Sequence, residues 1–316
     1  MACRPTRRVV YGAAAMTPVL RSAVFLLLLF GAVAAVHAST GTPLVILLAA
    51  LLPALAYAAL FTWIARRLQC RVHVLEAIFV GGAVIAAGLS VIASDLLHVW
   101  FTAQLGEQAV HDLTPAFGAP VVEEASKALA LLLVTSLRGR PSSVVDGILC
   151  GACVGIGFAM IENVGYFTLA VVQGGPLGLV RSVYLRGLVE GLNHASFTGA
   201  VGAGLAFARG ATSVRARIGA PVAGFAAAVL QHVIWNLVAS NAVMDVLCDP
   251  PIAGGSCRGA PTPLALFATV PLIVTLAIGP GVSALLVVAV RTSRGARRNA
   301  VVGARERRTP GHFDAQ

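Results

Sequence analysis

The chain has 316 residues, of which 58% are hydrophobic and only 11% are charged, and its mean hydropathy is +0.86. A soluble domain cannot bury so much apolar surface, so the composition predicts a polytopic membrane protein. The formal net charge of +10 comes from arginines that lie mostly in short segments between apolar runs. Membrane orientation explains this pattern better than nucleic-acid binding, and no nucleic-acid partner is expected.

The N-terminal region allows two interpretations. Residues 1–18 are basic, and the apolar run that follows is either a cleaved signal peptide or a first membrane span over 19–38. We favour the uncleaved span, because a second apolar run, 43–64, begins only a few residues later. Met16 is an alternative to Met1 as the start of translation.

Six further apolar runs bring the expected number of transmembrane helices to about eight. They lie at 74–92, 119–137, 144–172, 177–208, 218–240 and 264–290. The predicted fold is therefore all-α, a polytopic membrane helical bundle. Its expected parts are the first three helices with an outer loop (19–118), a catalytic core of four helices (119–241), an outer loop (242–263), a last helix (264–290) and a basic tail (291–316).

The arginines predict how the bundle is oriented. If the spans alternate from a cytoplasmic N-terminus, one side collects most of the arginines outside the N-terminal segment, and only Arg181, Arg186 and Arg258 lie at or beyond the other side. The first group comprises Arg66, Arg67, Arg71, Arg138, Arg140, Arg209, Arg215, Arg217 and the tail arginines from Arg291 to Arg308. The positive-inside rule then places both termini in the cytoplasm of a bacterial-type plasma membrane. Anionic lipid of the bilayer is expected to hold the tail.

The six cysteines are too sparse for a disulfide scaffold. Cys248 and Cys257 lie in the outer loop, where they are either bridged or two unpaired thiols. Cys150 and Cys153 form a C-x-x-C in a helix rich in small residues, where apolar packing explains them and no functional role is assigned.

Charged residues inside the 119–137 span are the strongest functional signal. Glu123 and Glu124 lie four and three residues before Lys127, the single lysine of the chain, so the ammonium can reach either carboxylate. A charged group at the middle of a membrane helix costs about 2.5–3.5 kcal/mol on insertion scales, which predicts a functional role. The alternative is a buried ion pair that fixes helix packing.

Three later spans carry further polar residues. Phe158 and Glu162 share one helix face, with Asn163 next to them, after glycines that permit close helix packing. Glu190 lies one turn before His194, where it either orients the imidazole or neutralises Arg186. In the seventh span, the spacing of four places His232 and Asn236 toward the same interior.

This set of residues suits general-base activation of water for amide hydrolysis, since the spans present no evident serine or cysteine nucleophile. The same groups also suit zinc, with Glu123, Glu162, His194 and His232 as possible ligands. Lys127 competes with a divalent ion for the carboxylates, and the sequence therefore favours a site without a metal cofactor. A proton-coupled transporter and a non-catalytic membrane scaffold or immunity-type protein are the alternative functions.

Four motifs, in order, resemble the PrsW family of intramembrane proteases, relatives of the type II CAAX prenyl endopeptidases. They are Glu-Glu-Ala-Ser-Lys at 123–127, Gly-Phe-Ala-Met-Ile-Glu-Asn at 157–163, Asn-His at 193–194 and His-Val-Ile-Trp-Asn at 232–236. The resemblance implies a glutamic-type enzyme that cleaves a single-span membrane protein, such as an anti-sigma factor, on the extracytoplasmic side. It implies that Glu123 activates water and that His232 and Asn236 match the last motif of the endopeptidases. Glu162 replaces a histidine of those relatives, which favours the PrsW branch.

The expected catalytic set is therefore Glu123, Glu124, Lys127, Glu162, His194, His232 and Asn236, supported by Phe158, Asn163 and Glu190.

Overall fold

The computed structural model describes residues 40–68, 70 and 72–239, together with helical residues 264, 268–270, 272–276, 279, 281–287 and 290–291. All regular secondary structure in this part is helical, as predicted. The predicted first span with its alternative start, the outer loop that holds Cys248 and Cys257, and the basic tail after residue 291 lie outside these residues. The last predicted span is described in part.

The described helices follow the predicted apolar runs. They are α2 (Leu44–Arg67), η1 (Val72–Val74), α3 (Leu75–Val80), η2 (Gly81–Ala86), α4 (Ala87–Leu105), α5 (Glu107–Leu113), η3 (Thr114–Gly118), α6 (Ala119–Arg138), α7 (Val144–Ser182), η4 (Val183–Val189), α8 (Gly191–Gly210), α9 (Val214–Ile234) and η5 (Trp235–Ala239). η1 is a 3₁₀ turn, and η2 to η5 are π-helical segments.

Four stretches of the described residues are long and apolar enough to cross a membrane: Leu44–Arg67, Val72–Leu105, Val144–Gly210 and Val214–Leu237. The membrane assignment is thus supported, whereas the number of about eight spans is not confirmed. The predicted first span and part of the last one lie outside the described residues, and two features account for the rest of the difference. α6 carries Glu123, Glu124, Lys127 and Arg138, which reduce its hydropathy. The long third stretch joins two predicted spans, separated at Gly175, where a positive φ of 58° interrupts the helix.

The ends of the core helices have local causes. Gly139 follows α6 with φ 109°, a conformation that favours glycine. Ser143 caps α7 by accepting a hydrogen bond from the Asp146 amide, and Ser213 caps α9 by accepting one from Ala216. Arg209 at the end of α8 donates to the Pro141 carbonyl, so the α6–α7 and α8–α9 connections lie at the same end of the bundle.

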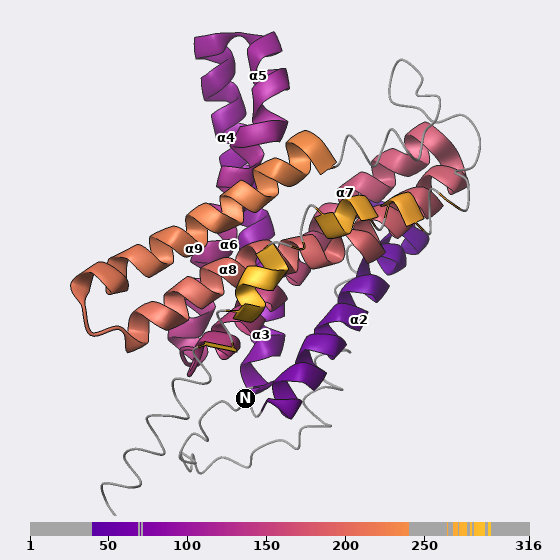
Figure 1. The fold of residues 1–316 in the computed structure, drawn as a ribbon. Helices are drawn as coiled ribbons and strands as arrows, with labels where there is room; N and C mark the ends of the chain where they lie inside the picture. The colour runs from indigo at the N-terminus through magenta and orange to yellow at the C-terminus, as the bar shows by residue number, and fades with distance from the viewer. Residues whose placement is uncertain are drawn as a thin grey trace, which may run out of the picture.

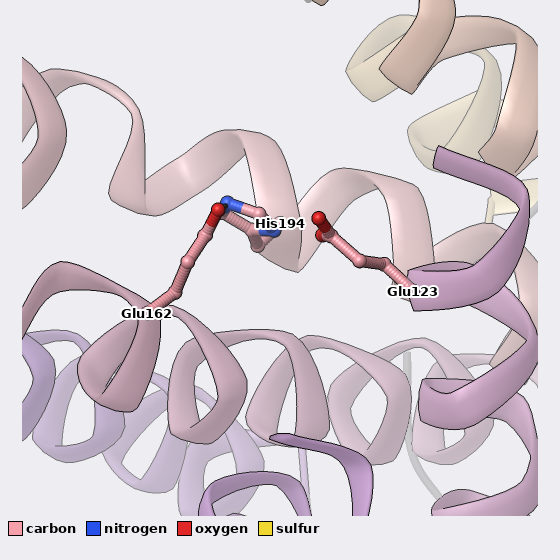
Figure 2. A group of neighbouring side chains, drawn as sticks. All are labelled: Glu123, Glu162 and His194. Carbon is pink, nitrogen blue, oxygen red and sulfur yellow. Dashed lines mark ion pairs between the residues drawn. The ribbon is translucent and has the colours of Figure 1, made fainter. Parts of the chain in front are cut away.

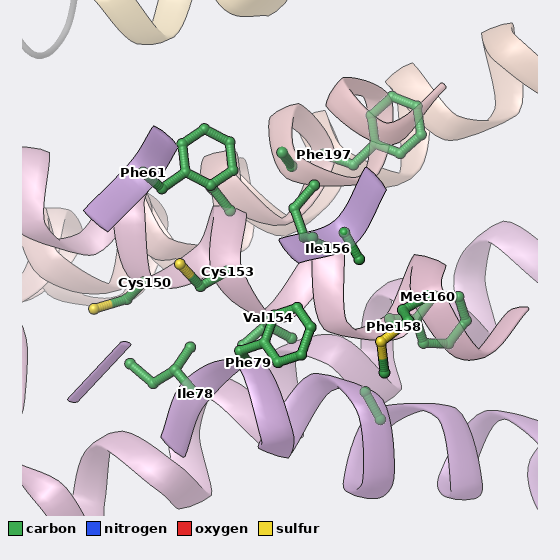
Figure 3. Close-up of a cluster of buried hydrophobic side chains, with 14 of the residues drawn as sticks. Phe61, Ile78, Phe79, Cys150, Cys153, Val154, Ile156, Phe158, Met160 and Phe197 are labelled. Atoms are coloured by element: carbon green, nitrogen blue, oxygen red, sulfur yellow. The ribbon is translucent and has the colours of Figure 1, made fainter. Parts of the chain in front are cut away.

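The first half of α7 lies at the centre of the bundle. α8 packs along one side of it, and α2, α3 and η2 pack along the others, while α9 packs on α8 and α6 (Figure 1). The core around it includes Phe79, Val154, Ile156 and Phe158, with the buried thiols of Cys150 and Cys153 among them (Figure 3). Apolar packing therefore accounts for the C-x-x-C, as expected. α4 and α5 project beyond the bundle as a hairpin (Figure 1).

Close contact between α7 and α8 depends on glycine. A Cβ atom on Gly155 would collide with the backbone of His194, and one on Gly151 would collide with the carbonyl group of Thr198. Without side chains at these two positions the helix backbones can touch, as in other membrane helix pairs. The glycines thereby set the distance at which His194 and Thr198 face the rest of the site.

We predict that Gly155→Ala destabilises the protein, because the methyl group must push α8 away from α7. Overpacking of this kind typically costs about 1–3 kcal/mol. Gly165→Ala is the matched control, since Gly165 lies in the same helix with nothing within 4 Å of an added Cβ. The control should be neutral or slightly stabilising, because alanine favours helix more than glycine does. Thermal unfolding in detergent measures both variants, and equal melting temperatures would contradict the prediction.

Candidate functional site

Lys127 of α6 is the centre of the candidate site. Its side chain is fully buried, and its Nζ lies 3.1 Å from Glu123 Oε2, 3.0 Å from Glu124 Oε1 and 3.0 Å from His194 Nδ1. An ammonium group has three N–H donors, so these three acceptors use all of them. The Phe158 ring covers the same ammonium, with its centroid 3.8 Å from Nζ, which adds a cation–π contact.

The contact with Lys127 determines the proton position on His194. A lysine ammonium only donates, so Nδ1 must accept and the proton of the neutral imidazole lies on Nε2. This nitrogen lies 3.1 Å from Glu162 Oε2 (Figure 2). A carboxylate beside the N–H of an imidazole orients the ring and fixes its tautomer. Glu162 is the residue in that position, and not Glu190, for which the sequence left this role as one of two alternatives.

Glu124 has partners on both oxygens. Its Oε1 accepts from Lys127 and from His232 Nδ1, the latter at 3.1 Å, and its Oε2 accepts from Thr198 Oγ1 at 3.2 Å. Its side chain has no exposed area. A carboxylate with this many donors is held as a fixed negative charge that ties α6 to α8 and α9.

Glu123 is bound less completely than its neighbour. Its Oε2 contacts Lys127 at 3.1 Å and lies 3.8 Å from His232 Nε2, while no hydrogen bond from the described residues reaches Oε1. Its side chain is 11% exposed. His232 gives its Nδ1 proton to Glu124, so its Nε2 in the neutral ring is an acceptor. Of the two adjacent glutamates, Glu123 is the one with an oxygen free to accept a proton.

Arg186 forms a second charged group beside the first. Its guanidinium lies 3.0 Å from Glu162 Oε1 and 3.2 Å from Glu190 Oε2, and its Nε donates to Asn163 Oδ1 at 3.2 Å. The Tyr166 ring covers it at 3.4 Å. Glu190 thus neutralises Arg186, which is the alternative that the sequence left open.

Glu190 is the N-cap residue of α8 and directly follows the π-helical segment η4. Its carboxylate contacts Arg186, four residues earlier, and Glu162 of α7 lies beside His194 instead. Sequence reasoning considered Arg186 only as a partner of Glu190 and did not assign it to the site. Arg186 could have been found from its position: it is a charged residue near the outer end of an apolar span that also contains His194.

Asn236 lies apart from the cluster. Its Nδ2 donates to the carbonyl oxygen of Pro115 in η3 at 2.9 Å, which ties η5 to the segment before α6. The sequence predicted that Asn236 would face the same interior as His232, four residues earlier. The helix changes to a π segment at Trp235, so the α-helical spacing no longer holds beyond that residue. The other expected catalytic residues, Glu123, Glu124, Lys127, Glu162, His194 and His232, are brought together.

The cluster carries an excess of negative charge. Its fixed cations are Lys127 and Arg186, and its carboxylates are Glu123, Glu124, Glu162 and Glu190. With neutral histidines and ionised carboxylates, two negative charges remain without a balancing cation. Because unbalanced charge in a buried site is costly, either protons or one divalent ion must compensate for them.

Three of these residues could hold a metal ion. Ligand atoms of Glu123, Glu162 and His194 all lie within 4.8 Å of one another (Figure 2). Glu162 Oε2 is buried and, apart from the charge contact with His194, has no hydrogen-bond donor in the described part of the chain. Three protein ligands of this kind fit a catalytic zinc. His232, the fourth ligand considered from the sequence, is not part of this group.

Residues 71–276 match the family model described as PrsW family intramembrane metalloprotease. The chain belongs to the PrsW family. The PrsW match begins after α2 and extends past α9, so it contains every residue of the candidate site. It confirms the family that the four sequence motifs indicated. No curated protein and no solved structure matches the chain.

Proposed function

We propose that this PrsW-family chain is an intramembrane endopeptidase that hydrolyses a peptide bond of a single-span membrane protein near the extracytoplasmic face. Membership of the family supports intramembrane protease activity. The observation that carries the mechanism is the unequal binding of two adjacent glutamates. Glu124 has hydrogen bonds on both oxygens, whereas Glu123 keeps Oε1 open.

In this proposal Glu123 is the general base. It takes a proton from a water molecule, the water oxygen bonds to the carbonyl carbon, and the carbonyl π electrons move onto the carbonyl oxygen. The carbon–nitrogen bond then breaks, and the proton held by Glu123 passes to the leaving amine, directly or through His194. General-base catalysis of this kind typically contributes about 10²–10⁴-fold.

The neighbouring residues prepare Glu123 for this role. The Lys127 ammonium keeps the carboxylate ionised between turnovers, since an opposite charge at 3.1 Å favours the charged form. Glu124 and Thr198 hold Lys127 and His232 in place, and Glu162 orients His194. The substrate class, an anti-sigma-factor-like protein in the bilayer, rests on the family resemblance of the four motifs.

We predict that Glu123→Gln lowers cleavage of a single-span test substrate by at least about 100-fold, because the amide cannot accept the proton. The change is nearly isosteric and removes few contacts, so the melting temperature should stay close to that of the wild type. Glu124→Gln should lower stability more, because three donors converge on Glu124.

Loss of less than tenfold in the Glu123 variant would refute the base assignment. Absence of any cleavage by the wild type, with a panel of single-span substrates in proteoliposomes, would instead favour the transporter or scaffold alternatives.

A metal-dependent form of the same function is supported by the grouping of Glu123, Glu162 and His194 and by the word metalloprotease in the family description. These three residues would hold the ion, which would polarise the carbonyl and activate a bound water. We favour the form without a metal, because Lys127 already contacts Glu123 and His194 and would repel a second cation.

We predict that purified, active enzyme keeps its activity after chelation and contains no stoichiometric metal. Elemental analysis of the chelator-treated protein, combined with a cleavage assay, measures this. About one zinc ion per chain, with activity lost on its removal and restored on its return, would overturn the metal-free form and leave the protease assignment intact.

We also propose that both termini are cytoplasmic, as the arginine asymmetry predicts. Cysteines introduced at Ser142 and Ser213, in connections at the same end of the bundle, should then be labelled only from the cytoplasm. A cysteine at Gln108, in α5, should be labelled from outside. Labelling of Gln108→Cys and Ser142→Cys from the same side would contradict this orientation.

A further inference from the structure

Asn193 is a buried carboxamide without a partner. It is 1% exposed, and neither its Oδ1 nor its Nδ2 makes a hydrogen bond in the part of the chain that the structure describes. Most buried polar groups in native proteins are paired, because an unpaired one loses its hydration without compensation. A carboxamide can both donate and accept a hydrogen bond, so it is complementary to the N–H and C=O groups of a peptide bond.

The packing of α8 on α9 locates Asn193 beside the candidate site. Asn193, Phe197, Ala200 and Gly204 are spaced at i, i+4, i+7 and i+11, which is one face of a helix. The last three meet α9: Phe197 stacks on His232 with ring centroids 4.9 Å apart, Ala200 lies against Gly224, and Gly204 lies against Ala220. Asn193 continues this face by one turn beyond Phe197 and His232.

The proposed reaction needs a hydrogen-bond donor near the carbonyl oxygen of the substrate. The water attack described above puts negative charge on the carbonyl oxygen, which requires N–H or O–H donors. Of the two donor residues expected from the sequence, His232 gives its Nδ1 proton to Glu124, and Asn236 donates one of its two Nδ2 protons to Pro115.

We propose that Asn193 is the residue that binds the scissile peptide group of the substrate. Its Nδ2–H donates to the carbonyl oxygen as charge develops there, and its Oδ1 accepts a backbone N–H of the extended substrate segment. This inference rests on the proposed protease function. It assigns to Asn193 the carboxamide role that the sequence pattern had suggested for Asn236.

The test is Asn193→Leu, an apolar change of similar size. Removing one oxyanion donor typically lowers kcat by about 10²–10³-fold, and we expect that loss together with a rise in KM, because the contact of Oδ1 with the substrate N–H is also lost. The melting temperature should stay the same or rise, because a leucine has no polar group to leave unpaired. Asn193→Ala should show the same loss of kcat if leucine does not fit the space.

Ser196→Ala is the matched control on the same helix. Ser196 donates to Gln231 Oε1 at 2.9 Å, so its removal should lower the melting temperature slightly and leave kcat unchanged. The measurements are kcat, KM and thermal unfolding of full-length protein with a single-span test peptide that the wild type cleaves. If both Asn193 variants keep kcat within about threefold, or lose stability in proportion to activity, the assignment is wrong. If the wild type cleaves no peptide while remaining folded, the protease function itself fails, and this inference fails with it.

Discussion

A single buried ammonium group holds the centre of this protein together. Lys127 is surrounded by two carboxylates, one imidazole nitrogen and one aromatic ring, which come from α6, α7 and α8. A lysine in an apolar bundle is tolerated only if each of its protons has an acceptor and its charge has a counter-charge. The position of α6 relative to α7 and α8 is therefore fixed by electrostatics as much as by packing. Loss of this one charge would leave Glu123 and Glu124 without a cation within hydrogen-bond distance.

Small residues make that arrangement possible. Glycines on α7 bring its backbone into contact with α8 at His194 and Thr198, so these two side chains extend past α7 toward α6. Membrane helices gain little from burying apolar side chains against each other, because lipid is equally apolar, and close backbone contact is the main alternative. The close contact between α7 and α8 therefore both packs the bundle and positions the side chains of the candidate site.

Similar residue types take different roles according to their partners. Glu124 is saturated with donors and acts as a fixed charge, while Glu123 keeps an open oxygen and is available for proton transfer. The two carboxamides differ in the same way. Asn236 of η5 donates to a backbone carbonyl of η3, whereas Asn193 has no hydrogen-bond partner among the residues that the structure describes. In the glutamate pair and in the carboxamide pair, one residue uses its hydrogen-bonding groups to hold helices together. The other residue keeps such groups available for the substrate or for proton transfer.

The sequence by itself determined the class of the fold and most of the site. Apolar runs defined the helices, and contacts within one helix followed from spacing, as with Glu123, Glu124 and Lys127. Four ordered motifs identified the family, which the family model confirms. The number of spans, by contrast, is not confirmed: the predicted first span lies outside the described residues, charges on α6 lower its hydropathy, and the two predicted spans on either side of Gly175 form one stretch.

Only the tertiary structure decided which groups meet across helices. It placed Glu162 rather than Glu190 on His194, and it engaged the Asn236 amide with the Pro115 carbonyl of η3. Glu162 reaches His194 from another helix, and Asn236 lies in the π-helical segment η5, where the α-helical spacing from His232 does not hold. Helical spacing determines which side chains are neighbours along one α-helix. The rotation of each helix against its neighbours depends on close packing and on the partners of the buried Lys127 charge, and these partners come from several separate segments of the sequence.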